Sequence, residues 1–192
     1  MAAQNKVKFN LKNVYYAMLQ EDPSTGVVTY GAPKRFPGAV SLSLSAEGEN
    51  EPFYADGVSY YVVSANNGYS GDFEMARIID DFKKDVLGYE LDENAVLVEN
   101  IDSQVKPFAL MFQFDGDQHD VRHVLYNCTC TRPDMESQTI EDKVEVKTDK
   151  VTLSANSVIA DGKNIIKAET TADTNAAAYA AWFTQVYMPD WV

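Results

Sequence analysis

The residues best suited to chemistry lie close together in one short stretch of the chain. His119 and His123 are the only histidines, and the only cysteines, Cys128 and Cys130, follow them. Both residue types bind zinc, but four ligands on one extended segment cannot converge on a tetrahedron. In a strand the two thiols point the same way, with their Cα atoms roughly 6.5 Å apart, which disfavours a disulfide. We therefore expect neither a metal site nor a disulfide.

Sequence motifs for enzymatic chemistry do not occur in the chain. There is no nucleophile elbow, P-loop, zinc-protease helix or dinucleotide-binding glycine motif. Residues 115–120 (DGDQHD) match the start of a calcium loop, but Asp120 stands where that loop needs glycine and Tyr126 where it needs glutamate. A hairpin turn rich in Asp and Gly explains the segment. The sequence predicts no catalytic residues, no enzymatic activity and no cofactor, and leaves open a hydrolase that uses His119 or His123.

The composition is that of one folded, acidic domain. The chain has 192 residues, with 16 Lys and Arg against 29 Asp and Glu, which gives a formal net charge of −13. Hydrophobic residues make up 45%, enough to bury one sizeable core, so we expect a single domain over residues 1–192. The acidity argues against a protein that grips nucleic-acid phosphates. No run of 18 apolar residues is present to cross a membrane.

The charge is unevenly distributed along the chain. Residues 1–46 carry five basic and two acidic side chains, whereas residues 47–102 carry fourteen acidic and three basic ones. One interpretation is a solvated acidic surface. The other is a protein whose copies meet positive patch to negative patch.

Strand patterns dominate the elements that must position these residues. The clearest is residues 39–46, where Val40, Leu42, Leu44 and Ala46 alternate with serines. Further strands are predicted at residues 14–19, 27–30, 58–65, 69–76, 96–98, 108–114, 121–131, 144–148, 151–155 and 165–169. The Asn-Gly pair at positions 67–68 lies between two of them and predicts a hairpin turn.

Helical spacing is confined to two short segments. Residues 79–87 begin with acidic side chains, continue with lysines and stop at Gly88, an order that suits the helix dipole and a glycine end. Residues 174–186 are rich in alanine and precede Pro189. The sequence therefore predicts one α+β domain that is mainly β.

The connection at residues 47–57 is unusual for a hairpin. It holds four acidic and no basic residues, together with Phe53 and Tyr54. Hairpin loops commonly have two to five residues, and longer polar loops that carry aromatics often contact partners. A surface loop with its aromatics folded back is the alternative.

Several blocks in this part of the chain resemble the major tail protein of long-tailed, non-contractile bacteriophages of Gram-positive hosts. They are residues 38–50 (GAVSLSLSAEGEN), 53–57 (FYADG), 58–61 (VSYY), 67–76 (NGYSGDFEMA) and 80–88 (DDFKKDVLG). The blocks cover about residues 36–90 and occur in the family's order. Some family members add an immunoglobulin-like domain at the C-terminus, and we expect none here because the chain ends too early for one.

The resemblance implies an antiparallel β-sandwich or partial barrel, flanked by one or two short helices and carrying a long hairpin loop. Six copies would close into a ring, and rings would stack head to tail into a tail tube. The implied partners are the chain itself, the tape-measure protein, the tail terminator and distal tail proteins, with genomic DNA passing through the lumen unbound and no membrane involved. The implied location is the virion, with assembly in the host cytoplasm.

Two sets of residues carry the implied roles. The polar face of the strand at 39–46 would line the lumen, where small hydroxyls and carboxylates let DNA pass, and its candidates are Ser41, Ser43, Ser45 and Glu47. The long loop would reach between rings, through Gly48, Glu49, Asn50, Glu51, Pro52, Phe53, Tyr54 and Asp56. The alternative is a carbohydrate- or surface-binding β-sandwich module that would use exposed aromatics such as Tyr60, Tyr61 and Tyr69.

Overall fold

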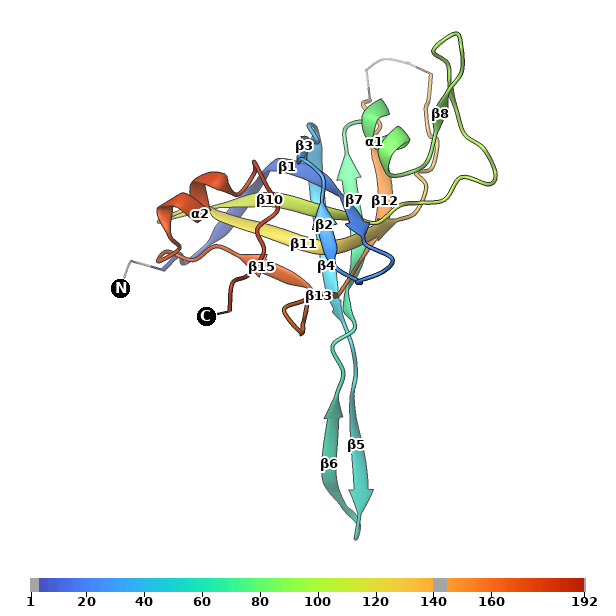
Figure 1. Ribbon diagram of the computed structural model, residues 1–192. Helices are drawn as coiled ribbons and strands as arrows, with labels where there is room; N and C mark the ends of the chain where they lie inside the picture. The colour runs from blue at the N-terminus through green and yellow to red at the C-terminus, as the bar shows by residue number, and fades with distance from the viewer. Residues whose placement is uncertain (1–3, 140–144, 192) are drawn as a thin grey trace.

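A curled antiparallel sheet of nine strands forms the body of the protein. The computed structural model describes residues 4–139 and 145–191 (Figure 1). The sheet order is β2-β1-β10-β11-β12-β7-β4, with β3 added to β1 and β15 added to β11. These strands are β1 (Lys8–Glu21), β2 (Val28–Tyr30), β3 (Lys34–Arg35), β4 (Ala39–Glu47), β7 (Gly68–Met75), β10 (Phe108–Gly116), β11 (Val121–Cys130), β12 (Asp149–Asn156) and β15 (Lys167–Glu169). The prediction of a mainly β, α+β fold is confirmed.

The main core lies between the two halves of the curled sheet. Figure 1 shows β4, β7 and β12 crossing the direction of β10 and β11, and β1 contacts β4 although the two are far apart in sheet order. Phe73 and Leu153 from one half pack with Tyr16 and Leu110 from the other, all of them buried. The curl is not closed by hydrogen bonds between the described parts of β1 and β4, so the sheet is a partial barrel.

A second core covers the outer face of β1, β10 and β11. Met111 and Tyr126 from the sheet pack there against Trp182 and Val186, which follow α2 (Ala176–Ala181). Strand β10 is therefore buried on both faces, which explains why its predicted apolar alternation is filled by further apolar residues at the intervening positions. Helix α2 is shorter at both ends than the predicted 174–186, and Asn175 caps it by accepting a hydrogen bond from the Ala177 N–H at 2.8 Å.

Helix α1 (Asp80–Asp85) closes one end of the main core and is shorter than the predicted 79–87. Its Phe82 ring stacks on Phe36 with centroids 4.4 Å apart and meets Tyr16 edge-on at 5.1 Å. The Tyr16 hydroxyl donates to Asp85 at 2.8 Å, and Lys34 lies 2.6 Å from the same carboxylate. Aromatic packing and these polar contacts of Asp85 hold α1 on the sheet.

The segment predicted as a loop at 47–57 is instead half of a two-stranded arm. Strand β5 (Asn50–Ala55) pairs with β6 (Val58–Ser64) across a two-residue turn at Asp56 and Gly57, whose φ angles are 52° and 78°. Positive φ at both central residues defines the type I′ turn that Asp-Gly favours. The predicted turn at 67–68 is wrong, because the Asn67 N–H donates to the Glu47 carbonyl at 2.9 Å and continues the ladder. Figure 1 shows the arm projecting from the body.

The predicted strand at 144–148 is wrong for residues 145–148, which lie outside any strand, and residue 144 is outside the described part of the chain.

Smaller hairpins complete the structure. They are β8 (Glu90–Leu91) with β9 (Leu97–Val98), and β13 (Val158–Ala160) with β14 (Lys163–Ile165). Among the described residues, no helix is both long and apolar enough to cross a bilayer.

Candidate assembly surfaces

One face of β4, β7 and β12 is a continuous polar surface. Ser41, Ser43 and Ser45 of β4 are exposed, while Leu42 and Leu44 between them pack against the main core. The predicted apolar row is shorter than expected. A register irregularity between Ala39 and Ser41 leaves Val40 50% exposed, and Ala46 is exposed where the strand leaves the core. The four lumen candidates, including Glu47, are all exposed.

The polar surface extends well beyond the serine row. Ser41, Ser43 and Ser45 lie beside Glu74, Asp72 and Ser70 of β7, which in turn lie beside Lys150, Thr152 and Ser154 of β12. Eight of these nine side chains are Ser, Thr, Asp or Glu, and the ninth, Lys150, forms an ion pair with Asp72. The intervening residues Phe73, Val151 and Leu153 point into the core. Sequence reasoning missed the second and third rows, although both alternate polar with apolar residues.

Hydrogen bonds and ion pairs organise the charges on this polar surface. Ser41 Oγ donates to Glu74 Oε2 at 3.0 Å, and Thr148 donates to the other oxygen of the same carboxylate. The Thr148 bond first, and the Ser41 bond second, lower the pKa of Glu74. Lys150 Nζ lies 2.7 Å from Asp72. The surface's one lysine is thus held by a carboxylate.

The arm is a two-stranded ribbon in which none of the described side chains is buried. Phe53 and Tyr61 lie opposite each other on one face and are 62% and 65% exposed, while Pro52 and Val62 are paired on the other face. A register irregularity follows Phe53, and Tyr54 is 65% exposed. An isolated two-stranded hairpin is at best marginally stable in water. The arm therefore presents apolar surface that the described chain does not cover.

The root of the arm is fixed by a glycine. Gly48 has a φ of +137°, and a Cβ atom there would lie 2.0 Å from the Ala65 carbonyl oxygen. Only glycine permits this close approach. Of the predicted stacking residues, Glu49, Asn50 and Asp56 are exposed. The side chain of Glu51 lies outside what the structure describes.

Strand β4 leaves a long sheet edge open. Among the described residues its ladder partner is β7 alone, so the backbone groups along its other edge have no strand partner. At the far end of the sheet order, β2 pairs with β1 alone. Open edges of this kind are templates for pairing with another chain.

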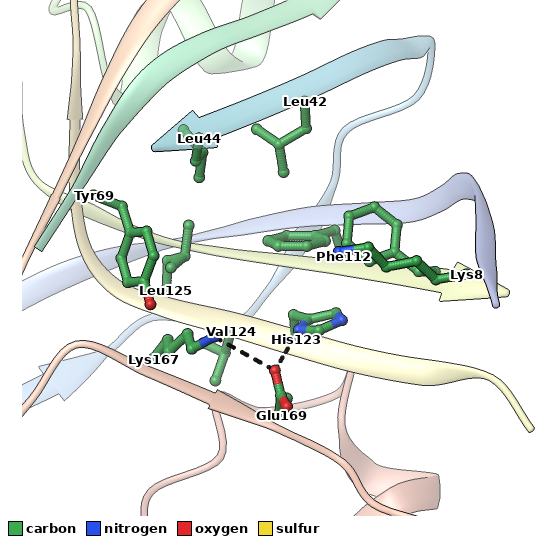
Figure 2. Close-up of a pocket in the computed structure, with 11 residues that line it drawn as sticks. Lys8, Leu42, Leu44, Tyr69, Phe112, His123, Val124, Leu125, Lys167 and Glu169 are labelled. Atoms are coloured by element: carbon green, nitrogen blue, oxygen red, sulfur yellow. Dashed lines mark ion pairs between the residues drawn. The ribbon is translucent and has the colours of Figure 1, made fainter. Parts of the chain in front are cut away.

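A groove between β4, β10, β11 and β15 holds one of the two histidines (Figure 2). The His123 ring stacks on Phe112 at 5.0 Å, and its Nδ1 lies 3.4 Å from Glu169 Oε2. Burial is the largest influence on His123 and lowers its pKa to about 4, against the opposing effect of Glu169. The groove thus holds a neutral imidazole at neutral pH.

The residues considered for enzymatic chemistry do not form a catalytic arrangement in the described chain. His119 lies beside Asn5, whose side chain accepts the His119 N–H, apart from the groove of His123. The described residues that line the His123 groove include no Ser, Thr or Cys. Cys128 and Cys130 are free and buried in the main core, and burial raises the pKa of each to about 12. The described residues include no cluster suited to a metal ion.

The tyrosines of the alternative sugar-binding interpretation are spread over two parts of the molecule. Tyr60 and Tyr61 are exposed on the arm. Tyr69 lies in the body, where it lines the groove with Lys167 Nζ 5.4 Å from its ring centroid.

Comparison with known proteins adds no relative to this picture, since no protein-family model matches the chain and a search of curated proteins finds no match.

Proposed function

We propose that this chain is a structural virion protein, the tail-tube subunit of a long-tailed, non-contractile bacteriophage of a Gram-positive host. Six copies form a ring, and rings stack head to tail into a tube through which the genome leaves the particle. In this role the protein has no catalytic activity and binds no cofactor. It is made in the host cytoplasm and resides in the phage tail.

The observation that carries the proposal is the arm. A solvent-exposed ribbon with apolar side chains on both faces costs stability unless a partner covers it. The chain places Phe53, Tyr54 and Tyr61 on it, and aromatic residues of this kind dominate interface energetics. An element that reaches from one copy to the next explains why such a ribbon is maintained.

The polar surface of β4, β7 and β12 supports the lumen part of the proposal. A wall of serine, threonine and carboxylate side chains offers DNA phosphates no cluster of free cations. Lys150, the surface's one lysine, is paired with Asp72. The open edges at β4 and β2 suit ring closure, because pairing between copies would satisfy backbone groups that a monomer leaves open.

The partners follow from this role. The chain contacts itself within and between rings, encloses the tape-measure protein during assembly, and meets the tail terminator and distal tail proteins at the two ends of the tube. DNA passes without specific binding.

Replacing residues 49–65 with a two-residue turn tests the proposal. We expect the shortened chain to melt like the parent, because its cores are intact, and to form no tubes under electron microscopy. A matched control replaces the Asp161-Gly162 turn of the β13–β14 hairpin with Asn-Gly and keeps assembly. Tubes of normal length from the shortened-arm chain would refute the role of the arm.

A sugar- or surface-binding module is the second candidate, favoured by the exposed Tyr60 and Tyr61. It predicts glycan binding by the monomer that is lost on replacing both tyrosines with serine, with no tube formation at any concentration.

A further inference from the structure

The arm has a chemical character that restricts what it can dock against. Between Glu47 and Ala65 it carries acidic residues and no basic one. Its exposed apolar residues include Phe53 and Tyr54. A complementary surface needs an apolar hollow with cations at its rim.

The end of the body opposite the arm does not meet this requirement. Figure 1 shows α1 and β8 at that end. Residues 77–106 hold eight acidic and four basic side chains, so this end would repel an acidic arm.

The groove around His123 does meet the requirement. Two adjoining cavities, of about 240 Å³ and 330 Å³, share Lys8, Phe114, His123 and Glu169 in their walls. An apolar cavity of about 150 Å³ accommodates a benzene ring, so either cavity has room for an aromatic side chain. Figure 2 shows Leu42 and Leu44 of β4 facing Phe112 and His123 across the cavity of about 240 Å³.

The rim of the groove is basic. Lys6, Lys8 and Lys167 line the two cavities, against the single carboxylate of Glu169. Lys8 Nζ lies 5.4 Å from the Phe114 ring centroid, and Lys167 Nζ lies 3.6 Å from Glu169. The Lys167 side chain is 45% exposed, so its ammonium group can form an ion pair with a second carboxylate.

We propose that the groove between β4, β10, β11 and β15 receives the arm of a second copy of this chain. Phe53 and Tyr54 occupy the hollow, and the carboxylates of Glu49 and Asp56 approach Lys8 and Lys167. The arm of the same copy projects away from the body (Figure 1), so the contact is between copies. Because arm and groove are different surfaces, the contact is heterologous, and between stacked rings it would extend the tube head to tail. This assignment deepens the proposed tube function and rests on its premise that copies assemble.

Cysteine cross-linking between copies tests the assignment directly. One copy carries Tyr54→Cys and an isotopically labelled second copy carries Lys167→Cys, and a short bismaleimide links thiols that come close. The native Cys128 and Cys130 are buried and remain unreactive. The control pairs Tyr54→Cys with Ile101→Cys, which is exposed and does not line the groove. We expect at least about tenfold more mixed cross-link to Lys167→Cys than to Ile101→Cys, read by mass spectrometry.

The result separates this inference from the proposed function. Tubes that cross-link preferentially through Ile101→Cys, or through neither position, would overturn the groove assignment while the tube function stands. Cross-linking to Lys167→Cys in small oligomers that never form rings or tubes would support the groove and overturn the tube function.

Charge reversal gives a second, independent readout. The variant Lys8→Glu/Lys167→Glu should raise the concentration needed for assembly at least about tenfold, and so should Glu49→Lys/Asp56→Lys. Combining all four changes in one chain should restore assembly. Lys163→Glu is the matched control, because Lys163 lies 3.8 Å from the Trp191 ring centroid and outside the groove. Normal assembly of the groove variant, or no restoration in the combined chain, would contradict the proposal.

Discussion

One long hairpin runs through both the body and the arm, as β4 and β7 in the body and as β5 and β6 in the arm. In the body, β4 and β7 are paired so that Leu42 and Phe73 face the main core. Beyond Gly48 the same hairpin continues as β5 and β6, which like β4 and β7 are paired with one register irregularity. None of the side chains that the structure describes in β5 and β6 is buried. Backbone pairing is therefore common to both, and burial is what differs. Body residues should control folding, and arm residues should control association.

The largest contrast is expected from truncating one phenylalanine in each region. Phe36 is buried among Tyr16, Phe73 and Phe82, so Phe36→Ala should lower the free energy of unfolding by about 3–5 kcal/mol. Phe53→Ala should change it by less than about 0.5 kcal/mol, because Phe53 is exposed in the monomer. Denaturant titration of both variants checks this.

Assembly should depend strongly on Phe53, although the free energy of unfolding does not. Phe53→Ala should raise the concentration needed for assembly about tenfold or more, since aromatic anchors carry much of the energy of interfaces. A folded Phe53→Ala chain that assembles like the parent would break the distinction between the two regions.

Acidification should weaken the body through His123. Burial holds the pKa of this histidine at about 4 in the folded chain, against about 6.5 when unfolded. Between these values the unfolded chain takes up a proton that the folded chain does not, so stability falls as pH falls from about 6.5 to 4. The loss should be on the order of 3 kcal/mol. The melting temperature of the parent should fall with pH over this window more steeply than that of His123→Phe. Identical dependence of the two melting temperatures on pH would contradict the assignment.

Strain at the arm root should be local. Gly48→Ala places a Cβ against the Ala65 carbonyl and should cost about 1–3 kcal/mol in arm pairing. Amide exchange should speed up within β5 and β6, while exchange in β10 and β11 stays unchanged. Gly26→Ala is the control, because Gly26 also has a positive φ but has no atom near its would-be Cβ. Faster exchange throughout the body would show that the arm is not an independent unit.

The smallest effect on folding is expected on the polar surface. Ser43→Lys is exposed and should change stability by less than about 0.5 kcal/mol while tubes still form. The added cation should slow genome passage, measured as ejection from assembled particles, whereas Ser43→Thr should not. Unchanged ejection would count against lumen exposure of this face.

The sequence predicted strands well where one face is buried and misjudged the turn that organises the arm. Both Asp56-Gly57 and Asn67-Gly68 are dipeptides that favour hairpin turns, and local chemistry does not rank them. The long-range register of β4 with β7, which buries Leu42 and Phe73, decides between them. In this register Gly68 pairs with Glu47 inside the ladder, so the turn forms at Asp56-Gly57.

The serine row was predictable from alternation, whereas the groove was not. Ser41, Ser43 and Ser45 are exposed because their neighbours face the core. The groove draws Lys8, Phe112, His123 and Lys167 from four strands separated along the chain, and no local spacing brings them together. The uneven charge along the chain was the one sequence signal that pointed toward complementary surfaces.

Cryo-electron microscopy of the purified protein at high concentration tests the assembly role of the arm most directly. We predict sixfold rings stacked into tubes, with the β5–β6 ribbon of each copy against a neighbouring copy and the serine row of β4 facing the lumen. Monomers at every concentration, or rings in which the ribbon remains in solvent, would contradict it.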